Sequence, residues 1–249
     1  MTKKNDNNKD IIKFPTLAER DRIRKKQNKE KEWRKEYKKK NHEPFFKFGN
    51  IPPFTGAMTA ILIFIHVVLN FALPYELRGQ ALETFAFTPA KIIGDFSLTT
   101  LLTPITYTLF HGDWMHLGFN AIMLLALGTF TERMFSTPTT IKFFALSTIG
   151  GALAYFILNP TTPTPVIGAS GAINGLFAAV LMMLHEQGRI PNPSQKNSLK
   201  GAWKIIGIWA GISLLFGLMG GGIAWQAHLG GLLTGATLYT LMRKRKLRL

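Results

Sequence analysis

The chain contains no cysteine among its 249 residues. Disulfides, thiolate metal sites and a cysteine nucleophile are therefore excluded. Charge is also scarce after the first fifth of the chain, because residues 1–50 hold 17 of the 30 Lys and Arg and 8 of the 14 Asp and Glu. The other 199 residues, with 13 basic and 6 acidic side chains, are too apolar to cover a water-soluble protein.

Six long apolar runs occupy this weakly charged part of the chain. Each run is close to the length, roughly 20 residues, that a helix needs to cross the hydrocarbon core of a bilayer. The runs lie at Ala57–Leu73, Asp113–Thr131, Ile141–Leu158, Ser170–Leu184, Ala202–Met219 and Ala224–Met242. The sequence therefore predicts an all-α polytopic membrane protein, a bundle of six transmembrane helices.

Charge divides the chain into three segments. Residues 1–50 form a basic tail that we expect to be partly helical or disordered, residues 51–243 form the membrane domain, and residues 244–249 form a short basic tail. Basic side chains concentrate on the cytoplasmic side of a membrane, so both termini are predicted to be cytoplasmic. We expect a bacterial inner membrane, with an organellar membrane as the alternative. Anionic lipid is the expected partner of the tails, rather than nucleic acid.

The connection from Pro74 to Gly112 is too long for a turn and too apolar for a solvated loop. It contains several large apolar side chains, including Phe85, Phe87 and Phe96. We expect a partly structured element embedded in the outer leaflet, with a turn at Phe87-Thr88-Pro89, packed against the first span.

Polar side chains within the predicted spans gather at one depth. His116 and Asn120 lie in the opening turns of the second span, Ser170 opens the fourth, and His228 lies one turn into the sixth. These spans all run from outside to inside, so a rise of 1.5 Å per residue places the four side chains within roughly 10 Å of the outer boundary. Polar groups in spans are functional candidates because their burial is costly.

These side chains have the chemistry of acyl transfer. A neutral imidazole at His228 can take the proton of the Ser170 hydroxyl, which makes the serine a nucleophile. No span carries an acidic residue where it could orient that imidazole, which predicts a Ser–His pair and no triad. The backbone N–H of Ser170 and the side chains of His116 and Asn120 are candidate donors to an oxyanion. Two G-x-x-x-G spacings, Gly171–Gly175 and Gly231–Gly235, favour close approach of the fourth and sixth helices.

Three segments resemble the rhomboid protease family: His111-Gly-Asp-Trp-Met-His-Leu-Gly-Phe-Asn120, Gly168-Ala-Ser-Gly171 and Ala227-His-Leu-Gly-Gly231. The resemblance covers about residues 51–242. It implies a rhomboid-like fold and cleavage of single-span membrane proteins near the outer face, without metal or cofactor. By this resemblance Ser170 is the nucleophile, His228 the base, and His116 with Asn120 the oxyanion donors. Supporting roles are implied for His111, Gly168, Gly171, Asn174 and Gly231.

The chain departs from the family pattern at two places. Asn174 stands where the family usually has Tyr or Phe stacked on the catalytic imidazole, so an amide that hydrogen-bonds the ring is one interpretation. Leu77-Arg78 is the nearest match to the Trp-Arg pair of the family's first outer loop.

Other functions stay open at this point. An inactive rhomboid-like protein that only binds transmembrane helices is the nearest alternative, and a small-solute transporter is the next. A transporter predicts polar groups at mid-bilayer and related halves, but the polar layer lies near one face and no repeat is evident. Zinc at His111 and His116 is disfavoured because the His-Glu-x-x-His pattern is absent and no carboxylate lies within the membrane core to complete a site. His66 and Asn70 are interpreted as structural polar contacts.

Overall fold

The structure is a computed structural model of the whole chain. It describes residues 16–19, 21–25, 27–28, 32, 50–187, 189, 200–218 and 224–246. The chain divides into two compact units, Met1–Gly49 and Asn50–Leu249. The rest of the predicted tail lies outside the described residues, as do 219–223, 247–249 and most of 188–199.

The first unit contains helical structure that begins after Thr16. Residues 17–19, 21–25, 27–28 and 32 are helical. The Thr16 Oγ1 accepts a hydrogen bond from the Glu19 backbone N at 3.3 Å, and Glu19 Oε2 accepts one from the Thr16 backbone N at 2.8 Å. This reciprocal pair is a capping box, which satisfies two backbone donors at the start of a helix.

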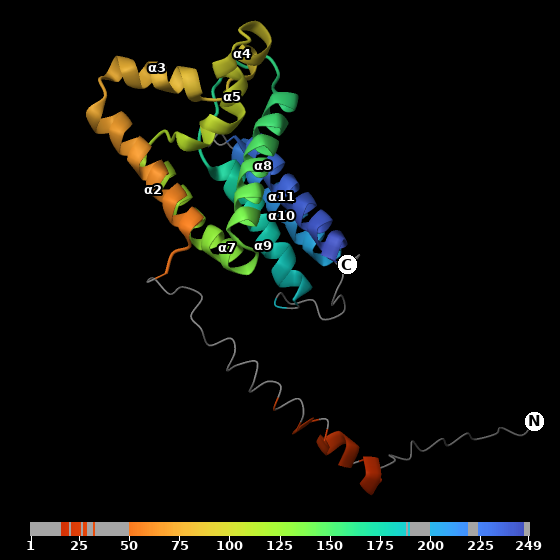
Figure 1. Cartoon of the computed structure of the whole chain (residues 1–249). Coiled ribbons are helices and arrows are strands. Elements are labelled where there is room, and N and C mark those ends of the chain that lie inside the picture. Colours follow the sequence, from red (N-terminus) through yellow and green to blue (C-terminus); the bar gives the residue numbers. More distant parts are fainter. Residues whose placement is uncertain are drawn as a thin grey trace, which may run out of the picture. The chain divides into compact units, whose positions relative to one another are not determined.

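Helices coincide with all six predicted spans among the described residues (Figure 1). The first span is α2 (Pro53–Val67), continued by the π-helical turn η1 (Val68–Ala72). The second comprises α6 (Trp114–Met123), η3 (Leu124–Gly128) and α7 (Thr129–Met134). The others are α8 (Thr137–Leu158), α9 (Ser170–Glu186), α10 (Lys200–Leu218) and α11 (Trp225–Lys246). Helix α11 continues three residues beyond the predicted end of the membrane domain.

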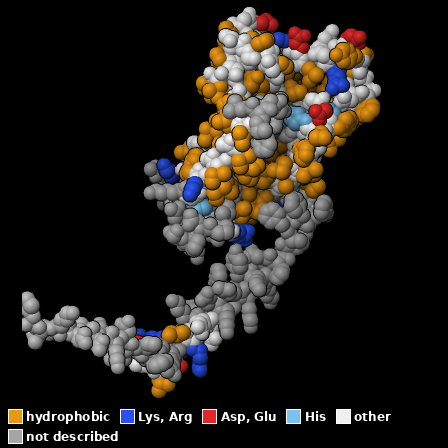
Figure 2. Space-filling view, turned by 180° about the vertical axis from the view of Figure 1, so that it is seen from behind, with side chains coloured by type: hydrophobic (Ala, Val, Ile, Leu, Met, Phe, Trp, Pro, Cys, Tyr) orange, Lys and Arg blue, Asp and Glu red, His pale blue; other side chains and the backbone are white. Residues whose placement is uncertain are grey.

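The second unit has the surface of an integral membrane protein. Within the described residues, Pro53–Ala72, Trp114–Met134 and Thr137–Leu158 are long and apolar enough to cross a membrane by length and composition. Large apolar side chains point outward from these helices, including Phe64, Ile122 and Ile157, whose exposed fractions are 67%, 65% and 64%. On the face drawn in Figure 2, hydrophobic side chains cover the middle of this unit, and charged side chains lie toward its ends. Such a surface suits lipid rather than water.

Helices α8, α9 and α11 pack closely because glycines line their contacts. A Cβ atom added to Gly231 of α11 would collide with the carbonyl oxygen of Gly171, and one added to Gly235 would collide with that of Gly175. On the other side of α11, a Cβ on Gly230 would collide with the carbonyl oxygen of Gly150 in α8. The two predicted G-x-x-x-G segments therefore face each other across the α9–α11 contact.

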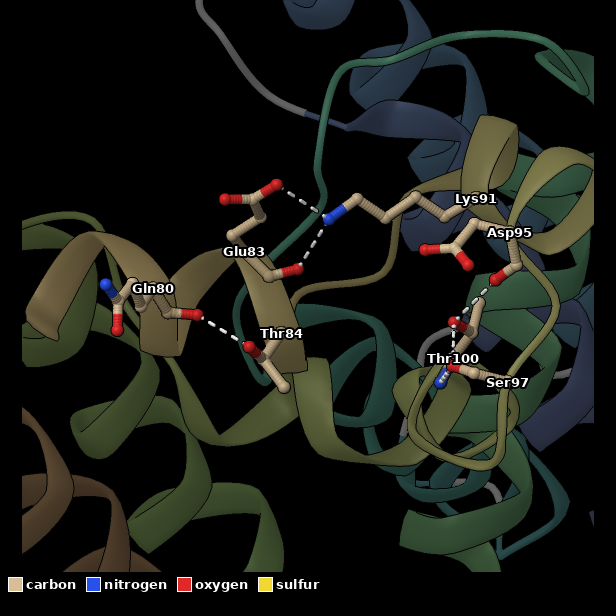
Figure 3. A network of polar contacts seen from close by, with 7 residues as sticks. All are labelled: Gln80, Glu83, Thr84, Lys91, Asp95, Ser97 and Thr100. Atoms are coloured by element: carbon tan, nitrogen blue, oxygen red, sulfur yellow. Dashed lines mark hydrogen bonds and ion pairs between the residues drawn. The ribbon is translucent and has the colours of Figure 1, made fainter.

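The connection between the first two spans is helical and held by polar contacts. It contains α3 (Tyr75–Phe85), α4 (Pro89–Gly94), α5 (Leu98–Thr106) and the 3-10 turn η2 (Tyr107–Leu109). Lys91 Nζ in α4 donates to the carbonyl oxygen and to Oε1 of Glu83 in α3, at 3.0 and 3.1 Å (Figure 3). Ser97 accepts a hydrogen bond from the Thr100 backbone N and so caps α5.

The position of this connection differs in part from the expectation. Its helix α5 packs against α8, and η2 makes the contact with the first span α2. At the predicted Phe87-Thr88-Pro89 turn, Phe87 forms an isolated antiparallel β-bridge with Val166. Val166 lies in the segment that leads into α9. The connection is therefore tied to the bundle beside the start of α9, rather than mainly along α2.

A buried carboxylate joins three helices at the end of the bundle opposite to α3. The side chain of Glu132, only 5% exposed, accepts hydrogen bonds from the backbone N of Phe54 and Thr55 at the start of α2, at 3.0 and 2.9 Å. It also accepts from the hydroxyls of Thr55 and Thr137, each at 2.8 Å. Because early backbone donors of a helix have no partner within the helix, this carboxylate stabilises the start of α2 and ties it to α7 and α8.

Candidate active site

Ser170 is the first residue of α9, and a glycine turn leads into it. Gly168 has a φ of +115°, a backbone conformation that L side chains rarely adopt. Its backbone N donates to the carbonyl oxygen of Tyr107 at 3.0 Å, which fixes the turn against η2. As the first residue of α9, Ser170 has a backbone N–H without a partner inside the helix, so this group is available to a ligand.

The two side chains predicted to form a pair are in hydrogen-bonding contact. His228 Nε2, from the first turn of α11, lies 2.7 Å from Ser170 Oγ. With a neutral imidazole protonated on Nδ1, the serine hydroxyl donates to Nε2. Gly231 lies one turn beyond His228 and faces Gly171, so the close helix contact brings these side chains together.

His116 and Asn120 lie on one face of α6, whose start is capped by Asp113. The Asp113 carboxylate accepts a hydrogen bond from the His116 backbone N at 2.7 Å. This donor, together with the Met115 backbone N, holds the pKa of Asp113 below its ordinary value of 3.8. Asn120 Nδ2 donates to the His116 carbonyl oxygen at 2.9 Å. An amide NH2 has two donors, so one N–H of Asn120 stays available.

The imidazole of His116 lies against the turn before the serine. A Cβ added to Gly168 would be 2.7 Å from His116 Nε2, so only glycine leaves room for the ring. On its other side the His116 ring contacts that of His111, with 5.0 Å between the ring centroids and an edge-to-face angle of 68°. Burial, together with the neighbouring His116 and His66 rings, lowers the pKa of His111 to about 3, so His111 is neutral at physiological pH. A neutral His111 supports His116 by packing.

A cavity of about 690 Å³ connects these side chains. Ser170, His228, His116 and Asn120 all line it, which places in one cavity every residue predicted to take part in the chemistry. The remaining wall is mainly apolar and comes from α6, α9, α10 and the segment before α9: Met115, Phe119, Met123, Ile167, Phe177 and Trp209. Among the described residues no group of three or more His, Cys, Asp or Glu could hold a metal ion.

Asn174 does not engage the imidazole. Its Nδ2 donates to the Ser170 carbonyl oxygen at 2.9 Å, and its Oδ1 accepts from Trp209 Nε1 at 3.0 Å. The ring of His228 is not among these partners, so the interpretation that this amide hydrogen-bonds the ring is not supported by the geometry. Trp209 was not singled out from the sequence, because one tryptophan in an apolar span looks like packing.

Two further residues around the site were not predicted from the sequence to contribute to it. Asp113 was counted in the predicted second span but is the cap residue just before α6, and an Asp at the start of an apolar run is a recognisable N-cap signal. Tyr107 is 1% exposed, donates to the Thr148 carbonyl oxygen at 2.9 Å, and places its hydroxyl 3.1 Å from a Cβ built on Gly171. No spacing rule predicts this contact, because Tyr107 lies in a connection of irregular helical pieces.

The fold and this cavity define a class: a polytopic helical membrane protein with a serine and a histidine in hydrogen-bonding contact where two of its apolar helices begin. The model of the Rhomboid domain matches residues 98–245 of the chain. The chain belongs to the rhomboid family.

Named relatives agree with this assignment. The chain is 28% identical over 207 residues to rhomboid protease GluP of Bacillus subtilis (strain 168), an alignment that covers 81% of this chain and 37% of GluP. It is 28% identical over 202 residues to rhomboid protease AarA of Providencia stuartii, covering 72% of this chain and 70% of AarA. It is 31% identical over 148 residues to putative rhomboid protease YdcA of B. subtilis, covering 59% of this chain and 69% of YdcA. The chain thus spans just over a third of GluP.

Proposed function

We propose that the protein is an intramembrane serine endopeptidase that cleaves single-span membrane proteins. The observation that carries the proposal is the 2.7 Å contact between Ser170 Oγ and His228 Nε2 inside the cavity. Membership of a family whose named relatives are rhomboid proteases supports the same reaction class.

The proposed reaction uses the residues in the roles predicted from the sequence. His228 Nε2 takes the proton of the Ser170 hydroxyl as Oγ attacks the scissile carbonyl, and a tetrahedral intermediate forms. The Ser170 backbone N–H, the free N–H of Asn120 and a ring N–H of His116 stabilise its oxyanion. The imidazolium of His228 then protonates the leaving amine, and water hydrolyses the acyl-enzyme by the same route in reverse. The reaction is proposed to need only this pair, because the close α9–α11 contact sets His228 against Ser170.

The proposal extends to membrane placement. Both termini lie in the cytoplasm, the site opens toward the outer leaflet, and the basic tails meet anionic lipid. The starts of α6, α9 and α11 supply the site residues, so cleavage takes place near one membrane face rather than at mid-bilayer.

Labelling by a serine-directed fluorophosphonate tests the proposal. Purified full-length protein in mild detergent is expected to be labelled at Ser170, located by peptide mass spectrometry. The variants Ser170→Ala and His228→Ala are expected to lose the label, because the first lacks the nucleophile and the second lacks the base. Labelling that persists in both variants, or a wild-type protein that is never labelled, would contradict a Ser–His peptidase and would favour a helix-binding protein without activity.

A further inference from the structure

A side-chain link between α9 and α10 ends at the backbone of Ser170. The Trp209 indole N–H in α10 donates to Asn174 Oδ1, and Asn174 Nδ2 donates to the Ser170 carbonyl oxygen. An indole nitrogen is a donor only, so its partner on Asn174 must be the oxygen, and the amide NH2 must face Ser170. These two partners fix the orientation of the Asn174 amide. A rotation of the amide group would break both hydrogen bonds.

The link is embedded in the wall of the site cavity. Ser170, Asn174, Phe177 and Trp209 all line the cavity. The rings of Phe177 and Trp209 lie 4.8 Å apart, so the indole is packed against α9 as well as hydrogen-bonded to it. This bond between the two helices is exposed, so its net contribution is that of one ordinary hydrogen bond.

Helix α10 packs on the bundle through apolar side chains: Ile206, 1% exposed, belongs to the buried core, and Ala210 packs against that core. A Cβ built on Gly207 or on Gly211, two residues before and after Trp209, would meet no atom within 4 Å. The neighbouring Ile208 and Ile212 are 56% and 40% exposed. Trp209 thus adds a hydrogen bond to α9 to the apolar packing of this part of α10.

We propose that Trp209 and Asn174 are positioning residues for Ser170: the indole fixes the amide of Asn174, and the amide holds the first turn of α9 in the geometry that sets Ser170 against His228. Neither side chain reaches the reacting atoms. The inference rests on the proposed peptidase function and extends it, because it assigns to α10 an effect on the reactivity of the serine rather than only a place in the wall. It also gives Asn174 a role that does not involve stacking on the imidazole.

The test is the kinetics of fluorophosphonate labelling in Trp209→Phe, which keeps an aromatic ring and removes the indole N–H donor together with the second ring. We expect the limiting labelling rate to fall between about twofold and tenfold, the range of one neutral hydrogen bond. The effect should fall on the limiting rate rather than on the fluorophosphonate concentration at half-maximal rate, because the proposed role is to orient Ser170 and not to bind the probe. The matched control is Trp203→Phe, the same change elsewhere on α10, which should label like the wild type.

Asn174→Leu supplies a second and independent variant. Leu has a similar size and removes both bonds, so the limiting rate is expected to fall at least as far as in Trp209→Phe. Combining the two changes should add nothing to Asn174→Leu, because they interrupt one link. Asn70→Leu is the control, since Asn70 makes the same amide bond to the carbonyl four residues earlier, 2.7 Å from His66 O, and has no indole partner.

Two results would overturn the positioning role while leaving the peptidase proposal intact. The first is wild-type labelling kinetics in Trp209→Phe or strictly additive effects in the double variant. The second is unchanged labelling together with faster cleavage of a single-span substrate, which would make the link a restraint on substrate entry only. A wild-type protein that is not labelled at Ser170 would overturn both proposals together.

Discussion

Replacing Gly231 by Ala should separate the serine from its base. A Cβ at this position would lie 2.6 Å from the carbonyl carbon of Gly171 and 3.1 Å from its Cα, against 3.4–4 Å for an ordinary contact, and it would also collide with the carbonyl oxygen. Because these atoms belong to the backbone of α9, α11 must retreat by about 1 Å. His228 sits one turn before Gly231, so its 2.7 Å contact with Ser170 would lengthen beyond about 3.2 Å, where a hydrogen bond is lost.

The expected effect is large on reactivity and moderate on stability. A displacement of 1 Å in a catalytic pair costs on the order of 10²-fold in rate, and overpacking a helix contact costs about 1–3 kcal/mol. The assay is the rate of fluorophosphonate labelling, with the thermal unfolding midpoint measured in the same detergent. Gly211→Ala is the matched control, because a Cβ there meets nothing within 4 Å and Ala favours a helix. Gly231→Ala labelled at the wild-type rate would refute the proposed dependence of the pair on this contact.

Three other perturbations follow from the structure. Glu132→Gln places an NH2 group among the hydrogen-bond donors that the Glu132 carboxylate now accepts from. The change should cost about 3 kcal/mol of stability, measured as a lower unfolding midpoint. An unchanged midpoint would mean that the carboxylate does not hold α2. The pKa of Asp113 is lowered from 3.8, so the stability that it contributes as a helix cap is complete above that value and is lost as the pH falls through the lowered pKa. Asp113→Asn should therefore flatten the acid dependence of the unfolding midpoint. An unaltered dependence would count against the cap. Met123 in α6 and Ser213 in α10 line the same cavity. A cross-link between cysteines introduced at these two positions should abolish cleavage of a membrane substrate, and the native chain has no cysteine to interfere. Unchanged turnover would show that α6 and α10 need not separate to admit the substrate.

The helices and the places of Ser170 and His228 near helix starts could be predicted from the sequence because both depend on local patterns. Apolar runs of span length mark the helices. Ser170 and His228 each follow a short connection, so each falls at the start of a span. The opposed glycine spacings of α9 and α11 predicted their close contact, which is found.

What could not be predicted are contacts between distant side chains in irregular surroundings. The connection that carries α3, α4 and α5 has no clear period, and its contact with α8 depends on tertiary packing. The Trp209–Asn174 bond joins residues on two helices whose relative rotation no spacing rule determines. Glu132 was passed over for a similar reason: its partners are backbone groups at the start of α2, which no side-chain motif reveals.

The central claim is that the hydroxyl of Ser170 cleaves peptide bonds within the membrane. Its most direct measurement is cleavage of a purified single-span reporter protein by the wild type and by Ser170→Ala, each reconstituted in lipid vesicles, with the fragments analysed by mass spectrometry. For the wild type, the account predicts two fragments produced by cleavage of a bond in or next to the membrane span. For Ser170→Ala, it predicts an intact reporter. Equal cleavage by both proteins, or an intact reporter with both, would contradict it.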